Sequence, residues 1–358
     1  MVLRPQLRRL PPLARRDAQI QERRREIRRL ERRLEARQRQ VDRLRAAPPP
    51  PPPYPPRKPS WHVRVMEQQR VQRAIGTDPG YADHPRHNLF LKLHNYEVAR
   101  SHGVSTPQVL GVWPSPAEID WAALPEEFVL KSNGGSTSRG VLPLRRTATG
   151  FEMLDGTRHF TADEIVEHYA TARRVRAPFF AETLLPGSHE QLPDDIKIYT
   201  YYGEVAFALL RRMPVHGDTS RSRVRFLGAD GTDLGELRHN RAPDDSVAAP
   251  RHYALMTGIA SVLSLAVPLP FLRVDLYDTP GGVVLGELTP LPGDSDTFLP
   301  QWDRRLGQLY DRAEARLQLD LARGRPFRVL HGPHDRSPQR PMPATTVVPD
   351  LPAGLPRR

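Results

Sequence analysis

Apolar residues recur every seven positions along an arginine-rich stretch near the start of the chain. The repeat is formed by Ile20, Ile27, Leu30, Leu34, Val41 and Leu44. Such a heptad predicts one long helix over residues 14–46 with a coiled-coil-like seam. Because Arg23 and Arg37 interrupt this seam, two interpretations stay open, a self-associating helix and a charged helix surrounded by solvent.

A proline run follows the predicted helix and separates it from the rest of the chain. The sequence PPPPPPYPP at 48–56 lacks the amide donors that helices and sheets need, so a stiff polyproline II linker is expected over residues 47–60. A second proline-rich stretch, residues 325–358, has little apolar content and is predicted to be a disordered tail. The helical segment is thus residues 1–46 and the body is residues 61–324.

The body alternates short apolar-polar runs with stretches of helical periodicity. The runs typical of strands are EEFVLK, APFFAE, IKIYTYYGE, VAFALL, FLRVDLY and VVLGEL. The helical stretches are LFLKLHNYEVARSHG, ADEIVEHYATARR and RHYALMTGIASVLSL. Together these patterns predict an α+β body with many antiparallel hairpins.

The formal net charge of +12 is concentrated in the helical segment. Residues 1–46 hold 16 arginines and 6 acidic residues, which leaves 37 basic and 35 acidic residues for the remainder. The body is therefore not expected to bind nucleic acid, whereas residues 14–46 could contact an acidic partner or a second copy. The chain has no cysteine, which excludes disulfides and thiolate chemistry, and no apolar run long enough for a transmembrane segment. We expect a cytoplasmic protein, and peripheral contact with the inner face of the membrane stays open.

The stretch FVLKSNGGSTSRGVLPL at 128–144 places a lysine before a loop of small residues. Lys131, backbone N–H groups and hydroxyls would together suit a polyphosphate, because glycines let a ligand approach the main chain. A Walker P-loop is excluded since its lysine follows the glycines, and a protein kinase is excluded since no H-R-D motif occurs. An ordinary surface hairpin loop remains the alternative.

A predicted hairpin, FLRVDLYDTPGGVVLGELTPLPG, carries a pair of carboxylates. Alternation puts Arg273 and Asp275 on one face, and a turn centred near Gly281 sets Asp275 opposite Glu287. Two carboxylates at cross-strand distance repel unless a cation joins them, and hard oxygen ligands suit Mg²⁺. Neutralising one carboxylate should then relieve repulsion. The alternative is a solvent-facing polar strand whose charges are compensated by arginine.

The order of these motifs resembles the ATP-grasp fold. The segments LPEEFVLKSNGGS, QLPDDIKIYTYYGE and FLRVDLYDTPGGVVLGELT are similar to the TupA-like ATP-grasp proteins, which are linked to teichuronic acid and related cell-surface polysaccharide synthesis. The resemblance spans residues 88–310. It implies an ATP-grasp body preceded by the coiled-coil-like helix.

The same resemblance implies the residues that bind ATP. Lys92 and Lys131 would hold the phosphates, and the loop from Ser132 to Gly140 would close over them. The further positions implied are Ser136, Thr137 and Ser138 in that loop, Glu182 and Leu185 at the adenine hinge, Glu190 at the ribose, and Lys197, which has no assigned role.

The resemblance also implies the metal ligands and the catalytic groups. Asp275, Glu287 and Thr289 would bind Mg²⁺, although Thr289 stands where many ATP-grasp enzymes have asparagine. Arg273 would stabilise developing negative charge, and the amide of Gly293 would help form an oxyanion site.

The activity implied is that of an ATP- and Mg²⁺-dependent ligase-like enzyme. ATP would phosphorylate an acid, and an amine or other acceptor would attack the acyl phosphate, with a glycan precursor as one of the reactants. The alternative is a catalytically degenerate ATP-binding scaffold that recruits envelope enzymes or an acidic polymer through its basic helix.

Overall fold

The computed structural model describes residues 11–45, 58–135, 140–172, 175–186, 193–213 and 222–334. The chain divides into two compact units, Met1–Lys58 and Pro59–Arg358.

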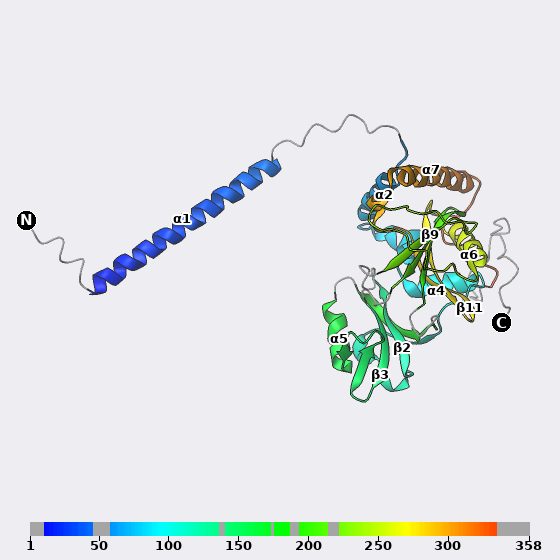
Figure 1. Ribbon diagram of the computed structural model, residues 1–358, viewed down its shortest axis with the longest axis horizontal. Helices are drawn as coiled ribbons and strands as arrows, with labels where there is room; N and C mark the ends of the chain where they lie inside the picture. Colours follow the sequence, from blue (N-terminus) through cyan, green and yellow to red (C-terminus); the bar gives the residue numbers. More distant parts are fainter. Residues whose placement is uncertain are drawn as a thin grey trace, which may run out of the picture. The chain divides into compact units, whose positions relative to one another are not determined.

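The first unit contains one long helix, α1 (Pro11–Arg45), drawn in blue in Figure 1. The helix predicted over residues 14–46 is therefore confirmed. Its apolar residues Ile20, Ile27, Leu30 and Leu34 are 42% to 70% exposed. The coiled coil stays a prediction. Within the described residues, no helix combines the length and apolar character needed to cross a membrane.

A six-stranded antiparallel sheet lies in the lower part of the second unit as drawn in Figure 1. Its strands are β1 (Val109–Trp113), β2 (Glu127–Gly134), β3 (Val141–Thr147), β4 (Gly150–Met153), β5 (His159–Phe160) and β6 (Arg176–Thr183), in the order β1-β6-β2-β3-β4-β5. Helix α5 (Ala162–Thr171) packs Ile165 and Tyr169 against the aromatic residues of this sheet. A capping box between Thr161 and Glu164 fixes where α5 begins.

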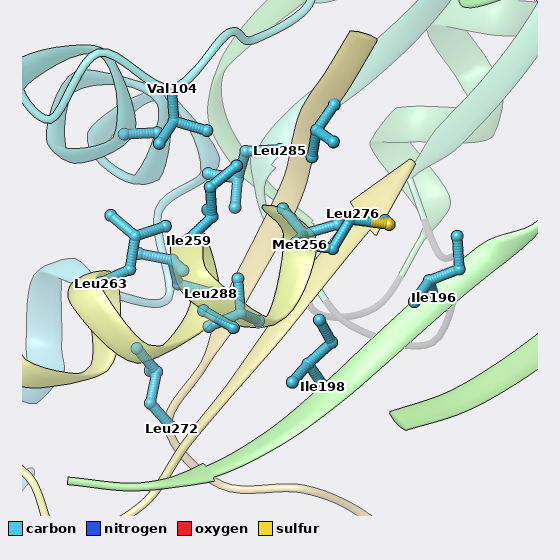
Figure 2. Packing of buried hydrophobic residues seen from close by; sticks show 14 of the residues in the cluster. Val104, Ile196, Ile198, Met256, Ile259, Leu263, Leu272, Leu276, Leu285 and Leu288 are labelled. Atoms are coloured by element: carbon cyan, nitrogen blue, oxygen red, sulfur yellow. The ribbon is translucent and has the colours of Figure 1, made fainter. Parts of the chain in front are cut away.

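The second sheet of this unit is antiparallel and has five strands. Its strands are β7 (Asp195–Tyr201), β8 (Glu204–Arg212), β9 (Arg223–Leu227), β10 (Leu272–Thr279) and β11 (Gly282–Thr289), in the order β11-β10-β7-β8-β9. Helices α6 (Tyr253–Ala266) and α4 (Lys92–Ser101) cover one face. Figure 2 shows this core, where Met256 and Ile259 of α6 lie against Ile198, Leu272 and Leu276 of the strands. The predicted α+β architecture is confirmed.

Helices α2 (Trp61–Ile75) and α7 (Pro300–Ala322) pack against the opposite face of the five-stranded sheet. Trp61 contacts Tyr201, Phe271 and Tyr310, with ring centroids 4.7–6.0 Å apart. Neither helix was predicted from the sequence, because each carries many charged residues around a narrow apolar stripe. The remaining helical turns are α3 (Pro85–Asn88), η2 (Pro79–Asp83), η3 (Pro116–Glu118), η4 (Trp121–Ala123) and η7 (Ser295–Thr297).

The segment after α7 packs onto the body instead of forming a free tail. Val329, Leu330 and His331 are buried, and the Leu330 amide donates to the Ala266 carbonyl over 2.9 Å. The prediction of disorder from residue 325 is therefore wrong for residues 325–334. Residues 335–358 lie outside the described part of the chain.

The hairpin register agrees with the sequence prediction, but a bulge is needed to produce it. Thr279 pairs with Gly282, which centres the turn between Pro280 and Gly281, half a residue before the predicted centre. The register then shifts by one residue at Gly286, and Asp275 pairs with Glu287. The bulge thus restores the predicted carboxylate pair.

Candidate active site

A buried ion pair joins β2 to β6 beneath helix α4. Lys131 Nζ lies 2.5 Å from Glu182 Oε1, and the Tyr96 hydroxyl donates to Glu182 Oε2 over 2.7 Å. Lys131 Nζ also donates to the Tyr96 hydroxyl over 3.2 Å. Burial alone would lower the pKa of Lys131, but Glu182 outweighs it and the pKa is raised. Lys131 is therefore a fixed positive charge.

Lys92 supplies a second buried cation from the first turn of α4. Its Nζ donates to the Gly135 carbonyl over 3.3 Å. Burial lowers the pKa of Lys92, nearby Lys131 lowers it further, and Glu287 opposes both effects. The Leu93 amide donates to Asn133 Oδ1 over 2.9 Å, which ties this end of α4 to β2. The two lysines thus lie close together, within electrostatic reach of the hairpin.

Asp275 is held by two cations on the five-stranded sheet. Arg273 donates from Nε and Nη2 to its carboxylate over 2.6 and 2.7 Å, and Lys197 donates from the facing position on β7. Lys197 Nζ also lies 2.9 Å from Asp195. Burial alone would raise the pKa of Asp195, but Lys197 and Arg211 lower it to about 2. The face predicted to carry Arg273 and Asp275 is therefore a charged cluster buried in the protein.

One carboxylate among the residues predicted to bind Mg²⁺ has no hydrogen bond or ion pair within the described part of the chain. No described residue forms a hydrogen bond or ion pair with Glu287, which lies opposite the paired Asp275. Thr289 Oγ1 accepts from Arg273 Nη2 over 3.0 Å. These oxygen donors fit Mg²⁺ if Lys197 or Arg273 releases one oxygen of Asp275. Among the described residues no group of three or more His, Cys, Asp or Glu is placed to hold a metal ion.

The other predicted positions are placed less centrally. Leu185 follows β6 and is half-buried, and Gly293 follows β11 with nothing close to the position of an added Cβ. Ser132 belongs to β2 and is fully buried, so the predicted loop is shorter than residues 132–140. Outside the described residues lie Ser136, Thr137, Ser138 and Glu190.

Sequence reasoning missed two side chains that position the charged groups. Tyr96 orients Glu182 and Lys131, and Asp195 binds Lys197. Periodicity could have found both. Tyr96 follows Lys92 by four residues on one helix, and Asp195 precedes Lys197 by two residues on one strand, so each pair shares a face.

The chain matches the family described as TupA-like ATPgrasp over residues 85–311, and it belongs to that family. This confirms the resemblance seen in the motifs and the ATP-grasp fold. Its class is therefore that of the ATP-grasp proteins. A search of curated proteins finds no match.

Several solved structures are similar at low identity. D-alanine–D-alanine ligase from Bacillus anthracis is 16% identical, with 65% of this chain and 70% of that chain covered and a TM-score of 0.41. D-cycloserine synthetase DcsG is 17% identical, with 71% and 80% covered and a TM-score of 0.39. The ATP-grasp ligase PsnB, complexed with a phosphomimetic variant of its minimal precursor, Mg and ADP, is 17% identical, with 72% and 67% covered and a TM-score of 0.36.

Proposed function

We propose that the protein binds ATP and Mg²⁺ and activates a carboxylate as an acyl phosphate for attack by an amine or another acceptor. The observation that carries this proposal is the cluster of Lys92, Lys131, Lys197 and Arg273 around Asp275 and Glu287. Fixed buried cations beside carboxylate oxygens suit a polyphosphate bound with a metal ion.

Each group has a role that follows from its surroundings. Lys92 and Lys131 hold phosphate oxygens, and buried Glu182 holds Lys131 in place for that contact. Asp275, Glu287 and Thr289 would hold Mg²⁺, which would supply positive charge to the phosphates. Arg273 faces the same space and stabilises charge on the transferred phosphoryl group. The remaining roles follow the family resemblance: Leu185 and Glu182 at adenine, Glu190 at ribose, and the Gly293 amide at the oxyanion.

The residues that follow Gly293 favour an amine or a sugar hydroxyl as the acceptor. Asp294 and Asp296 are exposed directly after Gly293, and carboxylates repel an anionic acceptor but accept hydrogen bonds from ammonium or hydroxyl groups. Together with the TupA-like motifs, this supports a glycan precursor in cell-surface polysaccharide synthesis as a reactant. We place the reaction in the cytoplasm.

We expect ADP release only when both an acid and an acceptor are supplied. The test is ADP release from Mg-ATP with a panel of uronic acids and amino acids as acids, and sugars and amines as acceptors. Hydroxylamine should trap the acyl phosphate as a hydroxamate that contains the acid. ADP release with an acid but without a trapped hydroxamate would contradict the acyl phosphate.

A catalytically degenerate scaffold is the second candidate. Two observations favour it: Lys197 and Arg273 already occupy the Asp275 carboxylate, and the apolar seam of α1 is exposed. A scaffold would bind ATP without releasing ADP in any combination of the panel. The basic helix would then recruit an acidic polymer or an envelope enzyme at the inner face of the membrane.

Removal of α1 should leave the body folded and able to bind ATP, while any self-association is lost. The shortened chain must keep Pro59 and Ser60, because Gly307 of α7 packs against them so closely that an added Cβ would lie 2.5 Å from the Ser60 amide nitrogen. Light scattering and ATP calorimetry of the full chain and of residues 59–358 test this. If the protein of residues 59–358 is insoluble or does not bind ATP, α1 is part of the body.

A further inference from the structure

Helix α1 exposes a row of apolar side chains that no described element covers. In its heptad, positions a and d form this row, positions e and g flank it, and positions b, c and f lie on the outer face. The apolar members of the row are 42% to 70% exposed. They are Ile20, Ile27 and Leu34 at a, and Leu30 at d. The row also contains Arg23 and Arg37 at d, so a helix that buries it must accommodate two arginines.

A second copy of α1 that runs in the same direction would place like charges against each other. Parallel helices pair a with a and d with d, so Arg23 would face the partner's Arg23, and Arg37 the partner's Arg37. On the flanks, Glu26 at g would lie beside the partner's Glu31 at e. Because like charges repel, this helix disfavours a parallel dimer.

The same helix is complementary to a copy that runs in the opposite direction. Antiparallel helices pair a with d, so a two-fold axis between positions 28 and 29 forms layers in which no arginines face each other. The layers are Ile27 with the partner's Leu30, Leu34 with the partner's Arg23, and Ile20 with the partner's Arg37. An arginine stem can lie along an apolar side chain while its guanidinium stays in water. The antiparallel row therefore has an apolar centre and tolerates its arginines.

The charges that flank the row favour this one register. In antiparallel helices g lies beside g and e beside e, so Glu26 meets the partner's Arg33. In the same way Arg24 meets the partner's Glu31, and the two-fold axis repeats both attractive pairs. A shift by one heptad would set Glu26 against the partner's Glu26 in one direction, or Glu31 against the partner's Glu31 in the other. Only the axis between positions 28 and 29 avoids both repulsions.

The other exposed arginines of α1 lie on its outer face, away from the row. They occupy positions b, c and f and are Arg25, Arg28, Arg29, Arg32 and Arg39. Salt screens exposed charges beyond about 8 Å at physiological ionic strength, and a helix is about 10 Å across. The excess positive charge of the helix thus opposes antiparallel pairing only weakly.

We propose that α1 binds a second copy of itself as an antiparallel two-stranded coiled coil with its axis between positions 28 and 29. The dimer does not depend on the chemistry proposed for the body. The body follows the carboxyl end of α1 in the chain, so antiparallel pairing attaches the two bodies to opposite ends of the paired helices. A parallel pair would attach both bodies to the same end.

Charge substitutions beside the row test the register in the full chain. Arg33→Glu should raise the dissociation constant of the dimer by at least about tenfold, because two attractive pairs become repulsive. Arg32→Glu changes the charge equally at a neighbouring outer position and is the matched control, which should associate like the wild type. Adding Glu26→Arg to Arg33→Glu should restore association. Sedimentation equilibrium over a range of protein concentrations measures each dissociation constant.

Disulfide cross-linking tests the direction of the helices, since the chain has no cysteine of its own. In the antiparallel pair, positions 20 and 37 face each other, but each lies about 25 Å along the axis from the same position of the partner. A disulfide needs Cα atoms within about 7 Å. Full-length Ile20→Cys and Arg37→Cys, oxidised in glutathione buffer, should therefore cross-link when mixed and stay uncross-linked alone. Mass spectrometry identifies the mixed dimer.

Three results would overturn the proposal. Either cysteine variant cross-linking with itself would show parallel helices. Arg32→Glu disrupting the dimer as much as Arg33→Glu would show that the flanking pairs do not form. A full chain that stays monomeric at every concentration would show that α1 has another partner, and its binding to phosphatidylglycerol vesicles would then identify an anionic membrane surface as that partner.

Discussion

Asp275→Asn should abolish the stabilisation of the protein by Mg-ATP. The wild type at a ligand concentration 100 times Kd should gain about 2.7 kcal/mol from binding. An amide oxygen is a much weaker Mg²⁺ ligand than a carboxylate, so the variant should gain little. Thermal melts with and without Mg-ATP, repeated with ATP and EDTA, measure the difference.

The same variant should also be less stable without ligand. The sequence alone predicts relief of repulsion between Asp275 and Glu287, but Asp275 is held by Arg273 and Lys197. Its neutralisation leaves two buried cations short of a partner and should lower the free energy of unfolding by about 3 kcal/mol, the lower end of the cost of breaking a buried ion pair. The structure thus reverses the sign expected from the sequence.

Glu167→Gln, at an exposed position of α5, is the matched control and should resemble the wild type with and without ligand. Equal Mg-ATP shifts in Asp275→Asn and the wild type would sink the metal assignment. A variant more stable than the wild type without ligand would show that carboxylate repulsion outweighs the ion pairs.

Lys131→Met should lower both ATP affinity and stability. It removes a cation next to the proposed phosphate loop, which should weaken ATP binding by about 1.5–3 kcal/mol. It also leaves Glu182 buried without its cation, with the Tyr96 hydroxyl as its remaining donor, which should cost about 3–5 kcal/mol of stability. Calorimetry with ATP and denaturant titration of the free protein measure the two losses separately.

A second substitution distinguishes the two effects. In Lys131→Met with Glu182→Gln, most of the stability should return because no unpaired charge stays buried. ATP affinity should stay low because the cation is absent and Glu182, proposed to meet adenine, is also changed. If the double variant is as unstable as the single one, the Lys131–Glu182 pair is not the source of the loss. ATP affinity unchanged in Lys131→Met would remove the loop from the site.

The sequence correctly predicted the helices and strands that depend on patterns among neighbouring residues. The heptad of Ile20 and Ile27 predicted α1, alternation around Arg273 and Asp275 predicted β10, and the strand pattern predicted the α+β body. It failed for α2 and α7, because their arginines mask the apolar stripe that packs on the sheet. It also failed for residues 325–334, where a few apolar side chains suffice to bind the segment to the body.

The sequence by itself determined which residues carry charge, which strands form the hairpin and which family the motifs define. Only the tertiary structure decided their partners. Lys131 meets Tyr96 across 35 residues and Lys197 meets Asp275 across 78, and periodicity carries no information about contacts between segments so far apart. The tertiary structure also decided which charges are buried. Elements distant in the chain exclude Arg86 and Glu182 from water. This exclusion gives their charges a large effect on stability and binding.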